Sequence, residues 1–290
     1  MSSASGSSPG HADHGARPAA GRYYRRFSAT ERVLHALLML TFVGCALTGL
    51  PPIFADQPWA AVLATYFGGF EAARQIHHAC AFVMLVVFAT HVIMVVWRAI
   101  ANRNLLSILW GPDSMVPQPR DAVDLYRNFK WFLGLGPQPQ FDRWTYWEKF
   151  DYWAVFWGMA IIGGSGLLLW FPVLFSRILP GWMFNIAALV HGEEALLAVG
   201  FIFTIHFFNS HLRPEKFPMD TVIFTGRISE HELKEERAVE YARLLREERL
   251  QAKEAPPPTL ESRAFGWFVG GAALLLGIVA IVLIVYSSLH

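Results

Sequence analysis

The sequence is poor in charged residues. They make up 16% of its 290 positions, whereas about a quarter is usual in a soluble domain. Together with a hydrophobic content of 54%, this deficit excludes an ordinary soluble enzyme. The formal net charge is +1, so there is no basic excess that would favour binding to nucleic acid.

Cysteine is scarce enough to exclude several kinds of cofactor site. The chain has two cysteines, Cys45 and Cys80, both within apolar runs, and it has no C-x-x-C pair. Covalently attached c-type haem, iron–sulfur clusters and a disulfide framework are therefore excluded within this chain.

Long apolar runs are what the sequence does contain. About 20 apolar residues are needed to cross the hydrocarbon core of a bilayer, and an unbroken run of that length satisfies its backbone in lipid as a helix. The expected fold is therefore an all-α, polytopic membrane helical bundle. Its five expected spans are Val33–Leu50, Ala72–Trp97, Tyr152–Leu174, Phe184–Phe208 and Phe265–Ser287.

The spans divide the chain into four expected regions. Residues 1–27, rich in Ser, Gly, Ala and Pro, predict a disordered cytoplasmic arm without a cleavable signal peptide. Residues 28–212 hold the first four spans, residues 213–263 form a charged cytoplasmic segment, and residues 264–290 hold the fifth span. The charged segment contains a predicted helix, because Ser229 and Glu232 have the spacing of a capping box.

The connection at residues 98–149 is rich in proline and contains a short amphipathic stretch near Asp121–Phe132. We interpret this connection as a structured loop at the membrane interface.

Basic residues outside the spans are distributed unequally. Of the 24 Lys and Arg residues, 22 lie on the side of the N-terminus, and two, Arg74 and Arg177, lie on the other side. By the positive-inside rule, we expect a bacterial inner-membrane protein with a cytoplasmic N-terminus. After five crossings its C-terminus is then periplasmic.

Histidines are concentrated in the spans. An ionisable side chain at bilayer depth is costly, so it is expected to face the bundle interior and to have a partner there. Seven of the 11 histidines lie in spans or at their ends, namely His35, His77, His78, His91, His191, His206 and His211.

Helical geometry sorts these histidines into two levels. His77 and His91 are 14 residues apart, and His191 and His206 are 15 apart, which separates each pair by about 21–22 Å along one helix face. The second and fourth spans run in the same direction, so His77 is level with His191, and His91 with His206. His35, on the oppositely directed first span, falls level with His206 and His91, and it competes with His91 for the position opposite His206.

Imidazole pairs from facing helices hold b-type haem without a covalent link, whereas zinc usually takes four clustered ligands. Histidines at two depths therefore favour two haems over a single ion.

His78 and His211 lie about 140° away from the ligand face. We expect His78 to face another helix or the interface, and His211 to suit a haem propionate or a quinone. Glycines in the first and third spans fit either a porphyrin near the backbone or close helix packing: Gly44, Gly49, Gly163, Gly164 and Gly166.

Three features of residues 27–211 carry a family resemblance. The fourth span has two spaced histidines, and the first and second spans open with Glu31-Arg32-x-x-His35 and Ala73-Arg74-x-Ile76-His77. In these features the chain resembles the membrane cytochrome b (gamma) subunits of formate dehydrogenases and, more distantly, the cytochrome b subunits of nickel–iron hydrogenases.

The resemblance implies a four-helix di-haem core with a fifth, C-terminal span added to it. It implies that His77 and His191 bind the haem near the periplasm, and that His35 and His206 bind the haem near the cytoplasm, with His91 as the alternative ligand. The chain departs from the family in its fifth span and in the spacing of 15 residues within the fourth span, where 14 is usual.

The resemblance also implies a quinone site near the cytoplasmic haem. The family's polar turn before the third helix, which contributes to that site, differs in this chain, where it reads Thr145-Tyr146-Trp147-Glu148-Lys149. The candidate quinone or propionate contacts are His211, Tyr146 and Lys149.

The expected function is that of an electron-transfer subunit in a membrane oxidoreductase complex of a respiratory chain, with quinone reduction or quinol oxidation. Electrons pass between a periplasmic iron–sulfur or multihaem cytochrome subunit, the two haems and the quinone pool. The alternative is a membrane transporter or metal-handling protein whose histidines bind ions; this reading predicts no visible absorption. A non-redox anchor for a partner complex leaves the histidine levels unexplained.

Overall fold

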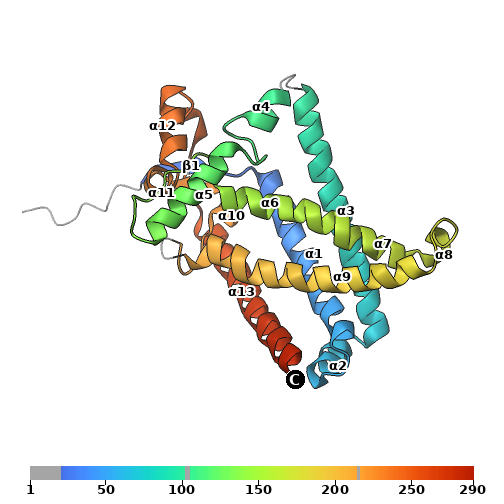
Figure 1. The fold of residues 1–290 in the computed structure, drawn as a ribbon. Helices are drawn as coiled ribbons and strands as arrows, with labels where there is room; N and C mark the ends of the chain where they lie inside the picture. The colour runs from blue at the N-terminus through green and yellow to red at the C-terminus, as the bar shows by residue number, and fades with distance from the viewer. Residues whose placement is uncertain (1–20, 102–104, 214–215) are drawn as a thin grey trace, which may run out of the picture.

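The computed structural model describes residues 21–101, 105–213 and 216–290. In this part of the chain five helices are long and apolar enough to cross a membrane (Figure 1). The predicted all-α, polytopic helical bundle is therefore confirmed. The five spans are α1 (Ala29–Ile53), α3 (Phe70–Ala101), Tyr146–Trp170, Trp182–Leu212 and α13 (Leu260–Leu289).

Polar caps make the first and third spans begin earlier than their apolar runs. Ser28 and Glu31 form a capping box at the start of α1, and Thr145 and Glu148 form another at the start of α6 (Tyr146–Gly158). Because each box satisfies backbone donors of the first turn, the helix extends back to it. The third span therefore begins before the predicted Tyr152.

The third span also ends earlier than predicted. It stops at Trp170 rather than at Leu174, and Pro172 begins a separate short helix, α8 (Pro172–Phe175). Proline has no backbone N–H and cannot continue the hydrogen-bond ladder of a helix, so the break falls just before it.

Two of the spans contain π-helical turns, which are uncommon and often occur at functional sites. The third span consists of α6, η1 (Met159–Gly163) and α7 (Gly164–Trp170). The fourth consists of α9 (Trp182–Phe201), η2 (Ile202–His206) and η3 (Phe208–Leu212). Shorter helices occupy the connections: α2 (Pro58–Tyr66), α4 (Leu105–Trp110) and α5 (Pro119–Phe132).

A small extramembrane domain lies at the end of the bundle where α1 begins (Figure 1). Its three-stranded antiparallel sheet places β1 (Tyr23–Arg25) between β2 (Arg227–Ser229) and β3 (Glu254–Ala255). The sequence predicts a disordered arm over residues 1–27, but residues 23–25 form β1. This strand is held by pairing with two strands far away in the sequence. Residues 1–20 of that arm lie outside the described residues.

The charged segment forms two helices instead of one, α11 (Glu230–Glu236) and α12 (Ala238–Arg246), with α10 (Val222–Thr225) before β2 and η4 (Gln251–Lys253) before β3. The predicted Ser229–Glu232 capping box is confirmed at the start of α11. An apolar core holds the domain together, formed by Tyr24, Val222, Ile228, Leu233, Leu244 and Leu250.

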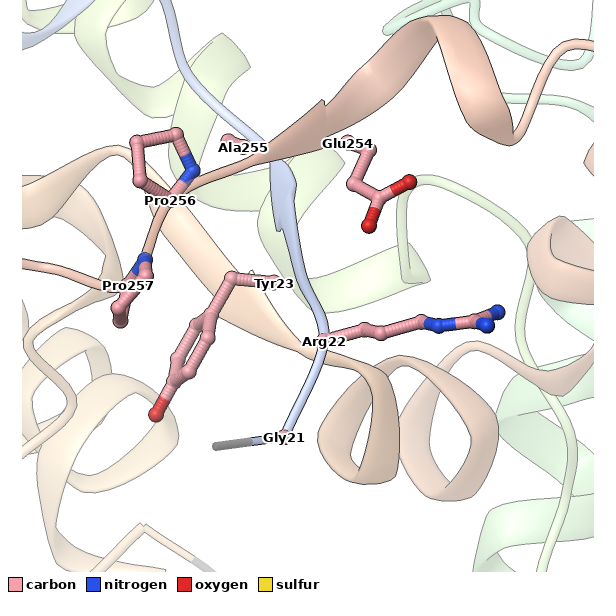
Figure 2. A pocket seen from close by; sticks show the side chains of 7 residues that line it. All are labelled: Gly21, Arg22, Tyr23, Glu254, Ala255, Pro256 and Pro257. Atoms are coloured by element: carbon pink, nitrogen blue, oxygen red, sulfur yellow. The ribbon is translucent and has the colours of Figure 1, made fainter. Parts of the chain in front are cut away.

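A shallow hollow lies at the edge of the sheet (Figure 2). It is lined by residues 21–23 and 254–257, which include none of the histidines of the spans.

Buried ion pairs attach the extramembrane domain to the start of the third span. Arg26 donates to the Glu240 carboxylate at 2.8 Å, Arg143 donates to the same carboxylate at 3.3 Å, and Arg237 donates to Glu148 at 2.8 Å. Burial and, after it, the neighbouring charge of Arg237 together lower the pKa of Arg26 to about 10, against the opposing effect of the Glu240 carboxylate. The guanidinium is therefore still charged at neutral pH.

Replacing Glu240 with leucine is expected to loosen the extramembrane domain. Glu240 is 2% exposed and Arg26 is 6% exposed, and leaving a buried charge without its partner costs about 3–5 kcal/mol. We expect limited proteolysis within residues 216–263 to accelerate strongly. The matched control, Glu235→Leu, changes a carboxylate whose side chain is 68% exposed and should leave the rate unchanged. Equal cleavage rates in the two variants would contradict this role of Glu240.

The fifth span packs against the fourth through a face of small residues. A side chain at Gly277 would collide with the Phe203 ring on η2, and one at Gly270 would collide with Met219. At the opposite end Trp59 Nε1 donates to Ser287 Oγ at 2.9 Å, and Figure 1 shows the C-terminus beside α2. The buried small residues of α13 are Gly266, Gly270, Ala273, Gly277 and Ala280.

Candidate functional site

His77 on α3 and His191 on α9 face each other inside the bundle. Their ring centres are 6.2 Å apart and their planes are inclined at 69°. The two metal–nitrogen bonds of an axial pair are each about 2 Å long, so the centres of two imidazoles on one iron are separated by about 6 Å. The observed separation fits a single iron between the two rings.

Hydrogen bonds determine which nitrogen of each ring is available. The His77 Nδ1 atom lies 3.1 Å from Thr48 Oγ1, whose own proton goes to the Gly44 carbonyl at 2.6 Å. The hydroxyl oxygen must therefore accept the proton of His77 Nδ1. The His191 Nδ1 atom donates to the Ile162 carbonyl at 3.0 Å. In both rings the Nε2 lone pair is left for a metal, which is the usual arrangement of a ligating histidine.

Two glycines provide space for these rings. A Cβ atom at Gly49 would lie 3.2 Å from His77 Cε1, and one at Gly166 would lie 3.0 Å from His191 Cε1. Gly44 instead abuts the Cys80 thiol, and Gly164 has nothing within 4 Å. The glycines thus serve different purposes: two admit an imidazole, and Gly44 allows α1 and α3 to pack closely.

A second group of histidines lies nearer the extramembrane domain. His206 Nδ1 is 3.0 Å from the Asp151 carboxylate on α6, a contact that orients the ring and leaves its Nε2 free. The histidines near His35 are His206 and His211. The first, third and fourth spans thus meet at this second level.

His91 has a different environment. Its Nε2 atom lies 2.9 Å from the Tyr152 hydroxyl, and its ring packs edge-on against Tyr152 with centres 5.6 Å apart. The charged groups near it are Arg98 and Glu31. Of the two residues predicted to compete for the position opposite His206, His35 is the one near His206, whereas His91 is engaged by the third span.

The π-helical turns account for the unusual spacing in the fourth span. A π-turn closes its hydrogen bond one residue later than an α-turn and so absorbs one extra residue. Because η2 ends at His206, the spacing of 15 between His191 and His206 corresponds to 14 in an uninterrupted α-helix. The departure from the expected family spacing is thereby compensated in the backbone.

The other predicted site residues have their own surroundings. His211 is buried, and its Nδ1 atom has no hydrogen-bond partner among the described residues. The Tyr146 hydroxyl pairs with Asn128 at 2.8 Å, and Lys149 Nζ pairs with Asp121 at 2.9 Å, so α5 occupies both polar groups. His78 stacks on Trp170 with ring centres 4.3 Å apart; as predicted, it faces another helix.

The sequence did not predict which groups orient the histidine rings: Thr48 and the Ile162 carbonyl carried no signal, and Asp151 was recognisable only as a titratable group at the cytoplasmic rim. Of these, Asp151 carried the clearest signal, because it is an acidic residue at the start of an apolar run. Among the described residues, no cluster of three or more His, Cys, Asp or Glu side chains could hold a bare metal ion.

Comparison with known proteins agrees with this geometry. The family model for prokaryotic cytochrome b561 matches residues 26–212, which include the first four spans and all seven histidines of the spans. No curated protein matches the chain significantly. A cytochrome b family implies b-type haem and an electron-transfer role in the membrane. The five apolar helices, together with the match to a prokaryotic family, support a bacterial multi-pass membrane protein. The chain belongs to the prokaryotic cytochrome b561 family.

Proposed function

We propose that this chain holds two b-type haems and passes electrons across the membrane between a periplasmic redox partner and the quinone pool. The observation that carries the proposal is the His77–His191 pair, with its ring centres 6.2 Å apart and both Nδ1 atoms engaged in hydrogen bonds. His35 and His206 are the proposed ligands of the second haem.

A bound haem supplies one-electron chemistry, and the chain supplies ligation, orientation and burial. Thr48 and the Ile162 carbonyl hold the His77 and His191 rings with Nε2 directed away from their hydrogen bonds. Asp151 holds the His206 ring in the same way, through its Nδ1 atom.

Quinone chemistry at the second level requires protons as well as electrons. We propose that Asp151 and His211 carry these protons, because both residues lie near His206, where the third and fourth spans meet. Tyr146 and Lys149 are not included, since α5 occupies their polar groups. The proposed partner, an iron–sulfur or multihaem cytochrome subunit, follows from the resemblance to formate dehydrogenase gamma subunits.

The experiment that tests this function is a dithionite-reduced minus oxidised spectrum of the purified chain, with a pyridine haemochrome assay. We expect b-type bands and about two haems per chain. An absence of b-type bands would contradict the proposal and favour the transporter or metal-handling alternative. A content far below two would contradict the di-haem assignment.

The proposed orientation has its own test. Because 22 basic residues lie on the side of the N-terminus and two on the other, we expect a periplasmic C-terminus. A phosphatase reporter fused after His290 should be active, and the same reporter inserted at Gln251 should be inactive. The opposite pattern would exchange the cytoplasmic and periplasmic sides of the two haems.

A further inference from the structure

The amphipathic helix α5 packs with its polar face toward the protein. Asp124 and Asn128 are 5% and 6% exposed. Asn128 Nδ2 donates to the Tyr146 hydroxyl at 2.8 Å, and Asp121 accepts from Lys149 Nζ at 2.9 Å. Both partners lie in the first turn of α6, so α5 is fixed where the third span begins.

The apolar face of α5 points outward. On a helix with 100° per residue, the apolar side chains at positions 122, 125, 126, 129 and 133 gather opposite Asp124. Tyr126, Phe129 and Phe132 are 65%, 64% and 66% exposed. An amphipathic helix that faced water would be turned the other way, with its apolar stripe on the protein.

The end of α5 shapes a groove along this apolar face. The chain turns at Gly134, whose φ is +70°, and the Leu135 N–H donates to the Lys130 carbonyl at 2.8 Å. This pattern is a Schellman motif, which requires a left-handed residue just after the helix, and it brings Leu135 back beside α5. The groove is lined by Ala122, Leu125, Tyr126, Phe129, Lys130, Leu133 and Leu135.

Charge and position indicate what covers this groove. Lys130 Nζ lies 5.8 Å from the centre of the Tyr126 ring at the groove. The Arg127 side chain lies 3.8 Å from the Asp124 carboxylate and is 64% exposed, so its guanidinium still reaches the surface. The acidic Asp121, by contrast, is paired inward with Lys149. The adjoining third span carries exposed aromatic residues that continue the apolar surface, Phe150, Trp153 and Trp157.

We propose that α5 lies in the headgroup region of the leaflet on the N-terminal side, with its apolar face among the acyl chains and with Lys130 and Arg127 against the phosphates of anionic phospholipids. A helix of this kind is held by buried apolar area together with attraction to anionic lipid. It would anchor the loop between the second and third spans beside the start of α6, whether or not two haems are bound.

The first test measures the depth of α5 in vesicles by spin labelling. The full chain, with Cys45 and Cys80 replaced by alanine, receives a nitroxide at Phe129→Cys, at the span position Phe268→Cys or at the extramembrane position Glu235→Cys. Phe268 is 77% exposed, and the Glu235 side chain is 68% exposed. We expect position 129 to resemble position 268, with oxygen accessibility several-fold above that of a water-soluble nickel complex.

Two results would overturn the proposal. If position 129 resembles position 235, the apolar face lies in water. If position 129 is shielded from both oxygen and the nickel complex, a protein surface such as a second copy of the chain covers it.

The second test concerns the anionic headgroup. In vesicles of phosphatidylcholine with added phosphatidylglycerol, nickel accessibility at position 129 should fall several-fold below its value in phosphatidylcholine alone. Lys130→Gln should abolish this difference, and the matched control Lys234→Gln, at a side chain 50% exposed on α11, should retain it. A lack of response to phosphatidylglycerol in the parent chain, or an unchanged response in Lys130→Gln, would refute the anionic contact.

Discussion

Replacing His77 or His191 with alanine is expected to remove one of the two proposed haems and to leave the other in place. Alanine offers no nitrogen to iron, and in our proposal both imidazoles, whose ring centres are 6.2 Å apart, bind the same iron. Haem content should therefore fall from about two to about one per chain in either variant. A pyridine haemochrome assay on the chain purified in detergent measures this ratio.

His78→Ala is the matched control for this loss. His78 is the neighbour of His77 in the sequence, but its ring stacks on Trp170, so this variant should retain both haems. The haem that remains in His77→Ala and His191→Ala also reports that the bundle has folded. Two haems with unchanged midpoint potentials in both variants would show that His77 and His191 do not form an axial pair.

His35→Ala is expected to lose the second haem, whereas His91→Ala should keep both. His35 lies near His206, while the His91 Nε2 atom is already engaged by the Tyr152 hydroxyl at 2.9 Å. Haem stoichiometry and redox titration of the two variants distinguish the pairings. We expect His91→Ala to affect quinone turnover at most, through the packing of α6 beside Asp151.

Tyr152→Phe completes this comparison. It removes the hydroxyl partner of His91 and keeps the ring, so both haems should remain. A loss of haem in His91→Ala with none in His35→Ala would assign His91 to the iron opposite His206. If each variant lost a different haem, the chain would hold a third.

The spans and their histidine levels could be predicted because they depend on local properties of the chain. A run of about 20 apolar residues forms a helix in lipid whatever its neighbours are. The helical rise per residue separates His77 from His91 and, apart from the residue that the π-turn absorbs, His191 from His206. The Ser229–Glu232 box was predictable for the same reason, since a capping box lies within one turn of sequence.

The ordered structure of residues 21–27 could not be predicted from the sequence, because it depends on contacts with residues far away in the chain. Tyr23 pairs with Ser229 and with Ala255, and three residues are too few to show the alternation by which a strand is recognised. Arg26 likewise resembled a surface residue of a basic arm, but Glu240 holds it in a buried ion pair.

What the sequence alone determined about this protein is its five-helix, all-α membrane architecture and a set of histidines within the spans, because hydrophobic length and helical period act locally. Only the tertiary structure decided which histidines meet. Tyr152 engages His91, Asp151 orients His206, and the π-turn before His206 absorbs the extra residue of the fourth span. These outcomes depend on how neighbouring helices rotate and pack against one another, which no single helix specifies in its own sequence.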